Sequence, residues 1–417
     1  MSLKINRADL SGHIWTFSSI AAANILPSAL IFVCTRLAGV WQVGVLSYAI
    51  SLAQLLQTVL LYGMRPFIAT DINLEYSFSE YMWIRVCGMI LSGAFLFFFL
   101  MFAGFDTTKV LVIIWYYFYK ASEAVSDTFE GSFQRRKRMD AAGMLRFFVN
   151  IAAITAFTAI MLYTNDMVLA VAVMLPASAL TIAVFVWRIR NFSERFELSV
   201  SAKKLKRLLT ACFPLFASNF LMFYLLDAQK YAIDKAMSPE ALAHYTILVL
   251  PSYFVNLMST SIFLGPELPK LSNYRLLKQF NLLIRRVKIQ YLFIVCISVA
   301  VIILGCFWGI SLLSFIYGVD LSGYRVHFIV LLLGGVFGAV NSVTGHLLVV
   351  FRRQKLYLAG YITIAAISLV GIPFFISSWG LMGACISKLV LNAILMAMFI
   401  AFFLVSYRRD KRAASES

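Results

Sequence analysis

Residues 82–104 read MWIRVCGMILSGAFLFFFLMFAG, a run in which Arg85 is the only charged side chain. An α-helix needs roughly 20 mostly apolar residues to cross the hydrocarbon core of a membrane. This run is therefore long enough and apolar enough to span one. Working outward from it, we find twelve such runs separated by short links. They cover residues 13–36, 42–64, 82–104, 109–130, 144–163, 167–188, 210–233, 242–264, 289–314, 325–350, 356–376 and 381–406.

The composition predicts the same class. Of 417 residues, 61% are apolar and 13% are charged, and the mean hydropathy is +0.85. Soluble domains are typically about half apolar and a quarter charged. Lipid solvates such a surface when every backbone polar group is bonded inside helices. We therefore predict an all-α, polytopic membrane protein, and we expect residues 13–36 to be a retained helix and not a signal peptide.

The basic residues predict the orientation of the chain. Assigning the links alternately to two sides places 28 basic residues on one side and 3 on the other. The densest clusters lie at residues 135–138, 188–207 and 352–355. Basic loops stay in the cytoplasm, so both termini are predicted to be cytoplasmic. The net charge of +17 is spread over short links between apolar runs, which argues against nucleic-acid binding.

Two segments of the chain resemble each other. Residues 134–143, QRRKRMDAAG, align without gaps to residues 351–360, FRRQKLYLAG. The segments lie six predicted helices apart on the same side. We therefore predict two parallel six-helix halves, residues 1–195 and 196–417, around a central cavity. Transporters built from such repeats bind substrate between the halves and expose it alternately to each side.

Several charged residues fall inside the predicted spans. A charge at membrane depth costs several kcal/mol unless it meets a partner, water or the interface. Arg36, Lys120, Lys230 and Lys388 are basic residues of this kind. One interpretation pairs Lys120 with Glu123, and Lys230 with Asp227 or Asp234, as structural contacts. The other has the three lysines and Arg36 line a cationic cavity, and we keep both open.

Polar residues share faces with these charges. Residues 116, 120, 123, 127 and 130 follow helical spacing and form one stripe, which we expect to face the interior between the halves. We expect five further polar side chains to line the cavity. These are Asn24, Gln54, Asn219, Asn256 and Asn392.

No recognisable catalytic or cofactor motif is present. The sequence contains no Walker loop, and no set of Ser, His and Asp or of Cys and His is recognisable. The six cysteines occur singly, without the spacing of a metal site. We therefore expect neither an enzyme, nor a cofactor, nor a bound metal.

These features resemble a known family. The twelve predicted helices, the basic link at residues 134–137 and its echo at residues 352–353 resemble the polysaccharide transporter branch of the multidrug/oligosaccharidyl-lipid/polysaccharide flippase superfamily. The chain looks like an O-antigen or capsule-unit flippase. That resemblance implies translocation of undecaprenyl-pyrophosphate-linked oligosaccharide across the cytoplasmic membrane. It also implies a lipopolysaccharide or capsule pathway in which a polysaccharide polymerase and assembly proteins are partners, alongside membrane lipids.

The resemblance also implies roles for residues. Arg36, Lys120, Lys230 and Lys388 match a cationic cavity that binds pyrophosphate and acidic sugars. Family members couple transport to a proton or sodium gradient, and the matching acids here are Glu123, Asp127 and Asp227.

Three other functions stay open at this point. A cationic-drug exporter of the same superfamily would need an acidic cavity, against which the lysines argue. A major-facilitator transporter usually carries a glycine- and arginine-rich link between helices 2 and 3, which residues 63–71 do not match. A membrane-embedded glycan polymerase would be expected to carry a long outer loop, whereas every predicted outer link is short.

Overall fold

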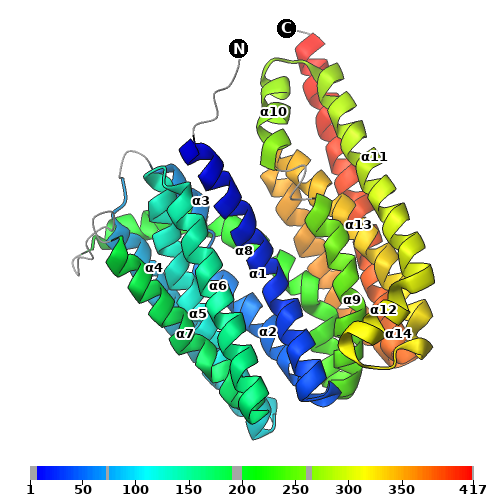
Figure 1. Ribbon diagram of the computed structural model, residues 1–417. Helices are drawn as coiled ribbons and strands as arrows, with labels where there is room; N and C mark the ends of the chain where they lie inside the picture. Colours follow the sequence, from blue (N-terminus) through cyan, green and yellow to red (C-terminus); the bar gives the residue numbers. More distant parts are fainter. Residues whose placement is uncertain (1–6, 72–74, 190–199, 260–264, 416–417) are drawn as a thin grey trace. The chain divides into compact units, whose positions relative to one another are not determined.

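A computed structural model describes residues 7–71, 75–189, 200–259 and 265–415, and within these ranges the regular structure is helical throughout (Figure 1). This confirms the predicted all-α class. In the first part of the chain the helices are α1 (Arg7–Leu37), α2 (Val40–Leu61), α3 (Arg65–Thr70), α4 (Phe78–Ala103), α5 (Thr107–Arg135), α6 (Met139–Thr164) and α7 (Met167–Arg188). The later helices are α8 (Ala202–Ala236), α9 (Pro239–Ser259), α10 (Gly265–Leu276), α11 (Phe280–Leu304), α12 (Ile310–Tyr317), α13 (Arg325–Val350) and α14 (Gln354–Ser415).

The helices account for the predicted spans. Among the described residues, nine helices are long and apolar enough to cross a membrane. One of them, α14, breaks at Trp379 and Gly380, where glycine takes a left-handed φ of 52°, so residues 354–378 and 381–415 form two helices. The charged helix α5 and the helix α9 occupy two more predicted positions. The chain is thus a multi-pass membrane protein, and residues 260–264 of the eighth predicted span lie outside the described residues.

The chain divides into two compact units, residues 1–223 and 224–417. Helix α8 contributes to both, because the boundary falls inside it. Leu208 and Cys212, from its first part, lie in a buried cluster of the first unit with Met64, Ile68 and Tyr81. The predicted boundary between the halves, at residues 195 and 196, lies outside the described residues and stays a prediction.

Helix α5 is the centre of the first unit. It packs against α2, α3, α4, α6 and α7, and α1 covers α6. Figure 1 shows α4, α5, α6 and α7 running side by side. Val112, Tyr116 and Ala124 of α5 are completely buried. The charged side chains of α5 are thereby held among neighbouring helices of this unit.

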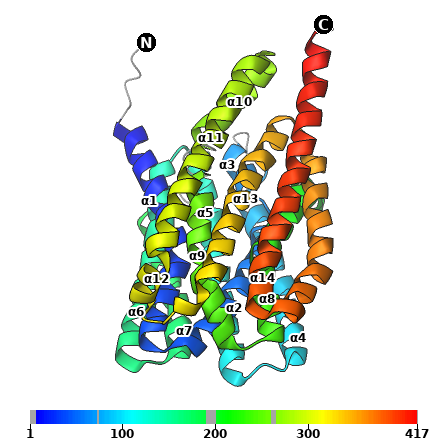
Figure 2. The ribbon, with the colours of Figure 1, turned by 90° about the vertical axis from the view of Figure 1, so that its right-hand side faces the viewer.

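In the second unit, α13 packs against α9, α11 and α14. Gly335 allows the approach to α9, because a Cβ there would lie only 2.7 Å from the Cβ of Ser252. The two helical parts of α14 lie along each other, orange and red in Figure 2. Tyr357 and Phe399 stack between them, with ring centroids 5.5 Å apart. Close packing of this kind drives helix association in lipid.

Three turns share one backbone conformation. In each, a basic residue after a helix has a left-handed φ of 57–60°: Lys137, Lys278 and Arg352. The next amide donates a hydrogen bond of 2.8 Å to the carbonyl five residues earlier, which is the Schellman motif. The turns at Lys137 and Arg352, in the two segments that resemble each other in sequence, thus end their helices in the same way as the turn at Lys278. The predicted repeat stays a prediction.

Candidate functional site

The Lys120 cluster lies in the first unit, where α5 meets α2. The Lys120 ammonium is 2.6 Å from one carboxylate oxygen of Glu123, and Gln57 of α2 donates to the same oxygen at 3.0 Å. The Tyr119 hydroxyl donates to the other oxygen at 2.7 Å. Glu123 therefore accepts three hydrogen bonds. The predicted Lys120–Glu123 contact is present, and it matches the structural interpretation of this lysine.

The arginine cluster lies further along the same helix. Asp127 accepts one hydrogen bond from Arg65 at 2.6 Å and another from Arg85 of α4. Arg65 also reaches Glu130 at 3.0 Å. Arg85 is completely buried and donates in addition to Thr128 at 3.1 Å and to the Leu60 carbonyl at 2.6 Å. The cluster thus joins α3, α4 and α5 through paired charges, and α2 through the Leu60 carbonyl.

This cluster bears on Arg85 and on the predicted stripe of α5. Arg85 lies inside α4, within the predicted span 82–104, and is bonded to Asp127. Burial alone would lower the pKa of the Arg65 guanidinium, but Asp127 and Glu130 more than offset it and raise that pKa. Asp127 and Glu130, the last two residues of the predicted stripe, bond to Arg65, which belongs to the same unit. Breaking such a buried pair costs about 3–5 kcal/mol.

The Lys388 cluster lies in the second unit and joins α8, α9 and α14. Lys230 is 2.9 Å from Asp227, and both side chains are buried. The Lys388 ammonium donates to the Leu226 carbonyl at 3.0 Å and lies over the Tyr253 ring, 5.2 Å from its centroid. The Tyr253 hydroxyl lies 3.4 Å from both the Leu226 carbonyl and Asp227. Two lysines from different helices therefore meet at one buried place.

The three intramembrane lysines differ in their partners. Lys120 and Lys230 each form an ion pair three residues along their own helix. No carboxylate of the described residues forms an ion pair with Lys388, whose side chain binds a neutral carbonyl and an aromatic ring. A buried ammonium without a paired acid attracts an anion strongly, because the surroundings screen it little. Lys388 is the best placed of the three to bind one.

The other predicted residues are more dispersed. Arg36 is exposed in the last turn of α1, and Asn24 is exposed with its amide bonded to the Ile20 carbonyl. The Asn392 amide donates to Gly334 of α13 at 3.2 Å, so this residue joins two helices. The remaining three are half-buried on α2, α8 and α9: Gln54, Asn219 and Asn256.

Sequence reasoning missed the partners on neighbouring helices. Gln57 contacts Glu123, although Gln54 was the residue predicted on that helix. The contact between Tyr253 and Lys388 could not be predicted, because nothing in the sequence links α9 to Lys388. Asp127 was predicted as an ion-coupling acid, yet two arginines hold it. Helical spacing places residues on one face of a helix but does not say which helix covers that face.

Comparison with known proteins identifies the family to which the chain belongs. Residues 10–265 match the model of a family described as polysaccharide biosynthesis protein. The chain belongs to this family. The match covers more than half of the sequence and confirms the resemblance to polysaccharide transporters. A search of curated proteins found no match.

Solved structures share the fold of this family member. An inward-facing multidrug resistance MATE transporter of the MOP superfamily matches with a TM-score of 0.68 and 15% identity, over 94% of this chain and 96% of that one. The MATE transporter VcmN of Vibrio cholerae in its bent form matches with a TM-score of 0.59 and 12% identity, over 97% of each chain. Family and fold together indicate a membrane transporter.

A third structure bears on pocket charge. A MOP superfamily transporter from Pyrococcus furiosus matches with a TM-score of 0.57 and 14% identity, over 96% of this chain and 95% of that one. That protein is described as having a binding pocket of reverse polarity that suggests a different function. At such identities the likeness shows the fold alone.

Proposed function

We propose that this protein is a flippase for undecaprenyl-pyrophosphate-linked oligosaccharide, such as an O-antigen or capsule repeat unit. It acts in the bacterial inner membrane with both termini in the cytoplasm, and it works by alternating access. Membership of the polysaccharide biosynthesis protein family supports the substrate class. The transporter fold supports the mode of action.

The observation that carries the proposal is the environment of Lys388. Its ammonium is buried within a predicted span and binds only the Leu226 carbonyl and the Tyr253 ring among described groups. Pyrophosphate is the most highly charged part of the proposed substrate. Lysine is a point charge on a flexible stem, so it can follow a phosphate as the protein changes conformation. Lys388 is thus the first anion-binding residue in the proposal.

Lys120, Lys230 and Arg36 complete the proposed cationic set. In the structure, Lys120 and Lys230 are paired with Glu123 and Asp227. An arriving anion competes with these acids for the lysines. When the lysines regain their acids, the anion is released. A proton or sodium gradient would drive this exchange through Glu123 or Asp227. Asp127 is the third candidate acid, but Arg65 and Arg85 hold it in the arginine cluster.

The proposal is tested in a flippase-null strain that makes lipid-linked repeat units. The wild-type gene should restore surface polysaccharide, and Lys388→Gln should not, at equal protein abundance in the membrane. Lys355→Gln is the matched control, since Lys355 is an exposed lysine in the first helical part of α14, whereas Lys388 lies in the second part. Full restoration by Lys388→Gln would remove Lys388 from the mechanism, and no restoration by the wild type would reject this substrate class for the strain tested.

An ion-coupled exporter of small molecules is the second candidate, because the matching structures include multidrug transporters. A cationic drug needs an accessible acid. Asp127 is held by two arginines and Asp227 by Lys230, which disfavours this function. Drug resistance conferred on a sensitive strain, without export of polysaccharide, would favour it over the flippase. A polymerase and assembly proteins stay proposed partners of the flippase.

A further inference from the structure

Tyr253 of α9 contacts the acceptors of both lysines in the Lys388 cluster. Its hydroxyl lies 3.4 Å from the Leu226 carbonyl oxygen and 3.4 Å from Oδ1 of Asp227. Lys388 donates to the first of these acceptors at 3.0 Å, and the Lys230 ammonium lies 2.9 Å from the second. The Tyr253 hydroxyl therefore shares one acceptor with each lysine.

Both contacts of this hydroxyl are long. A hydroxyl donor in a normal hydrogen bond lies roughly 2.5–3.0 Å from the oxygen that accepts it. The Tyr253 hydroxyl has one proton to donate and faces two acceptors at equal distance. The lysines hold those acceptors through shorter bonds. The hydroxyl is thus a donor whose bond to the Leu226 carbonyl can shorten when Lys388 moves away.

The ring of Tyr253 contacts the same lysine. The Lys388 ammonium lies 5.2 Å from the ring centroid, which is within the range of a cation–π interaction. The ring therefore attracts the ammonium, while the hydroxyl at its end reaches the Leu226 carbonyl. A single side chain of α9 thus contacts both the donor and the acceptor of the Lys388–Leu226 hydrogen bond.

That hydrogen bond opposes anion binding by Lys388. An ammonium that moves toward a phosphate leaves the Leu226 carbonyl, and a buried acceptor that loses its donor raises the free energy of the protein. The Tyr253 hydroxyl lies close enough to replace the ammonium at this carbonyl. Asp227 does not lose its charged partner in the exchange, because the oxygen that the hydroxyl leaves is the one next to Lys230.

We propose that Tyr253 is a positioning residue that frees Lys388 to bind the pyrophosphate of the substrate. Its hydroxyl bonds to the Leu226 carbonyl as the ammonium leaves, and returns to its shared position when the ammonium comes back. Both acceptors therefore keep a donor throughout the exchange. The inference rests on the proposed function, because it takes the anion from there.

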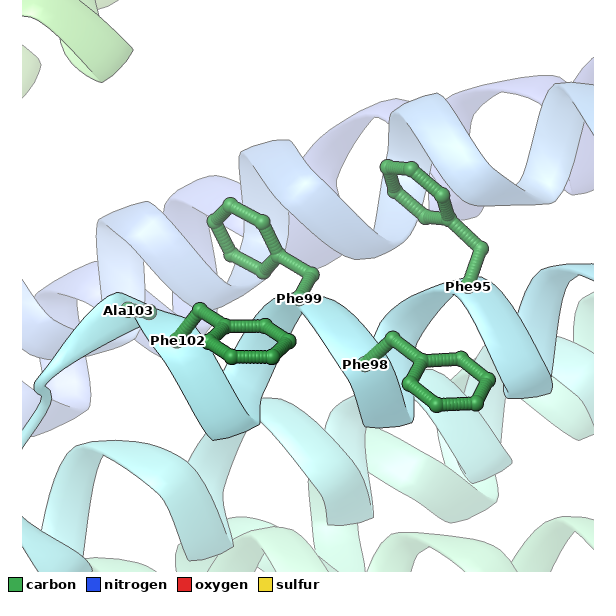
Figure 3. Close-up of a pocket in the computed structure, with 5 residues that line it drawn as sticks. All are labelled: Phe95, Phe98, Phe99, Phe102 and Ala103. Atoms are coloured by element: carbon green, nitrogen blue, oxygen red, sulfur yellow. The ribbon is translucent and has the colours of Figure 1, made fainter.

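A hollow on α4 shows by contrast why an anion is assigned to a polar cluster. It has a volume of about 370 Å³ and is lined by Phe95, Phe98, Phe99, Phe102 and Ala103. Figure 3 shows the four rings spread along α4. The side chains of this hollow offer a phosphate neither a positive charge nor a hydrogen-bond donor. The Lys388 cluster offers both.

The test measures equilibrium binding of undecaprenyl pyrophosphate to the full chain in phospholipid nanodiscs. Tyr253→Phe keeps the ring and removes the hydroxyl, so it should weaken binding about tenfold, as expected for one buried hydrogen bond. Its melting temperature without the lipid should be unchanged, because the two lost contacts are long. In Lys388→Gln there is no ammonium to release, so adding Tyr253→Phe to it should lower the affinity no further.

The matched control is Tyr291→Phe in the same unit, where the Tyr291 hydroxyl lies 2.8 Å from that of Thr344. This variant loses a shorter hydrogen bond, so it should have a lower melting temperature but the affinity of the wild type. The two tyrosines are therefore expected to show opposite effects in the two measurements.

The possible failures are distinguishable. Equal affinity of Tyr253→Phe and the wild type would overturn the inference and leave the proposed function standing. A melting temperature of Tyr253→Phe lowered as much as that of Tyr291→Phe, or a further loss of affinity in the Lys388→Gln background, would give the hydroxyl a structural role and also overturn it. No binding by the wild type would reject the proposed function, and the inference with it.

Discussion

The Lys388 ammonium donates a hydrogen bond of 3.0 Å to the backbone carbonyl of Leu226, and so joins α14 to α8 in the second unit. The same carbonyl lies within 3.4 Å of the Tyr253 hydroxyl. Burying a charge without a paired acid is costly, so an intramembrane lysine of this kind is a candidate functional residue. Lys120 and Lys230 carry their own acids, and this difference separates Lys388 from them.

Arg85 should be the most sensitive residue of the arginine cluster. Arg85→Gln leaves Asp127 with one arginine and removes three hydrogen bonds of a completely buried side chain. The expected loss of stability is about 3–5 kcal/mol. It would be measured as a lower melting temperature of the purified protein and a lower abundance in membranes. Arg188→Gln, at an exposed arginine, should change neither, and an unchanged melting temperature of Arg85→Gln would show that the cluster does not stabilise the fold.

The three left-handed turn residues predict stabilising substitutions. A residue other than glycine pays roughly 1–2 kcal/mol for a left-handed conformation. Lys137→Gly, Lys278→Gly and Arg352→Gly should therefore each raise the free energy of unfolding, by up to about 1 kcal/mol once the lost charge at the helix end is counted. This would be measured as a higher melting temperature. Lys288→Gly is the control, because an exposed position inside α11 should lose about 1 kcal/mol. A fall in all four variants would contradict the assigned turn conformation.

The fold was more predictable from sequence than the site. Long apolar runs predict spans because lipid demands length and hydrophobicity, and the long helices follow these runs, whereas the short helices α3 and α10 lie in predicted links. Arg85 shows where this reasoning stops. The sequence places it inside a span without showing a partner for its charge, whereas the structure pairs it with Asp127, 42 residues further on. Contacts between helices depend on which faces meet, and a single sequence does not contain that information.

The Lys120–Glu123 contact was predictable because both residues lie on one helix, one turn apart. The Gln57 and Tyr253 contacts were not, since each comes from a different helix.

Glu123 should control coupling to the ion gradient. A proton on Glu123 would break its contact with Lys120 and free that ammonium for an anion. Glu123→Gln should therefore keep transport of lipid-linked oligosaccharide in vesicles but lose its response to an imposed pH gradient. Asp410→Asn is the control, because Asp410, near the end of the chain, is paired with Arg275 and Arg353 and lies far along the sequence from Glu123. A pH response of Glu123→Gln equal to the wild type would exclude Glu123 as the coupling acid.

The predicted topology can be measured independently. Cysteine placed at Arg136 or Lys204 should escape a membrane-impermeant thiol reagent in intact cells and react after the cells are opened, because basic links stay in the cytoplasm. Cysteine at Asn165, in the turn between α6 and α7, should react in intact cells. The native cysteines would first be replaced. Labelling of the Arg136 or Lys204 positions from outside would contradict the orientation on which the flippase direction depends.

The most direct test of the central claim is translocation by the purified protein. Vesicles containing the full chain and a fluorescent undecaprenyl-pyrophosphate-linked oligosaccharide would be treated with an impermeant quencher, and the protected fraction followed with time. The wild type and Lys355→Gln should move the lipid to the accessible leaflet, and Lys388→Gln should do so no faster than protein-free vesicles. A wild-type rate equal to that of protein-free vesicles, or a Lys388→Gln rate equal to the wild type, would contradict the account.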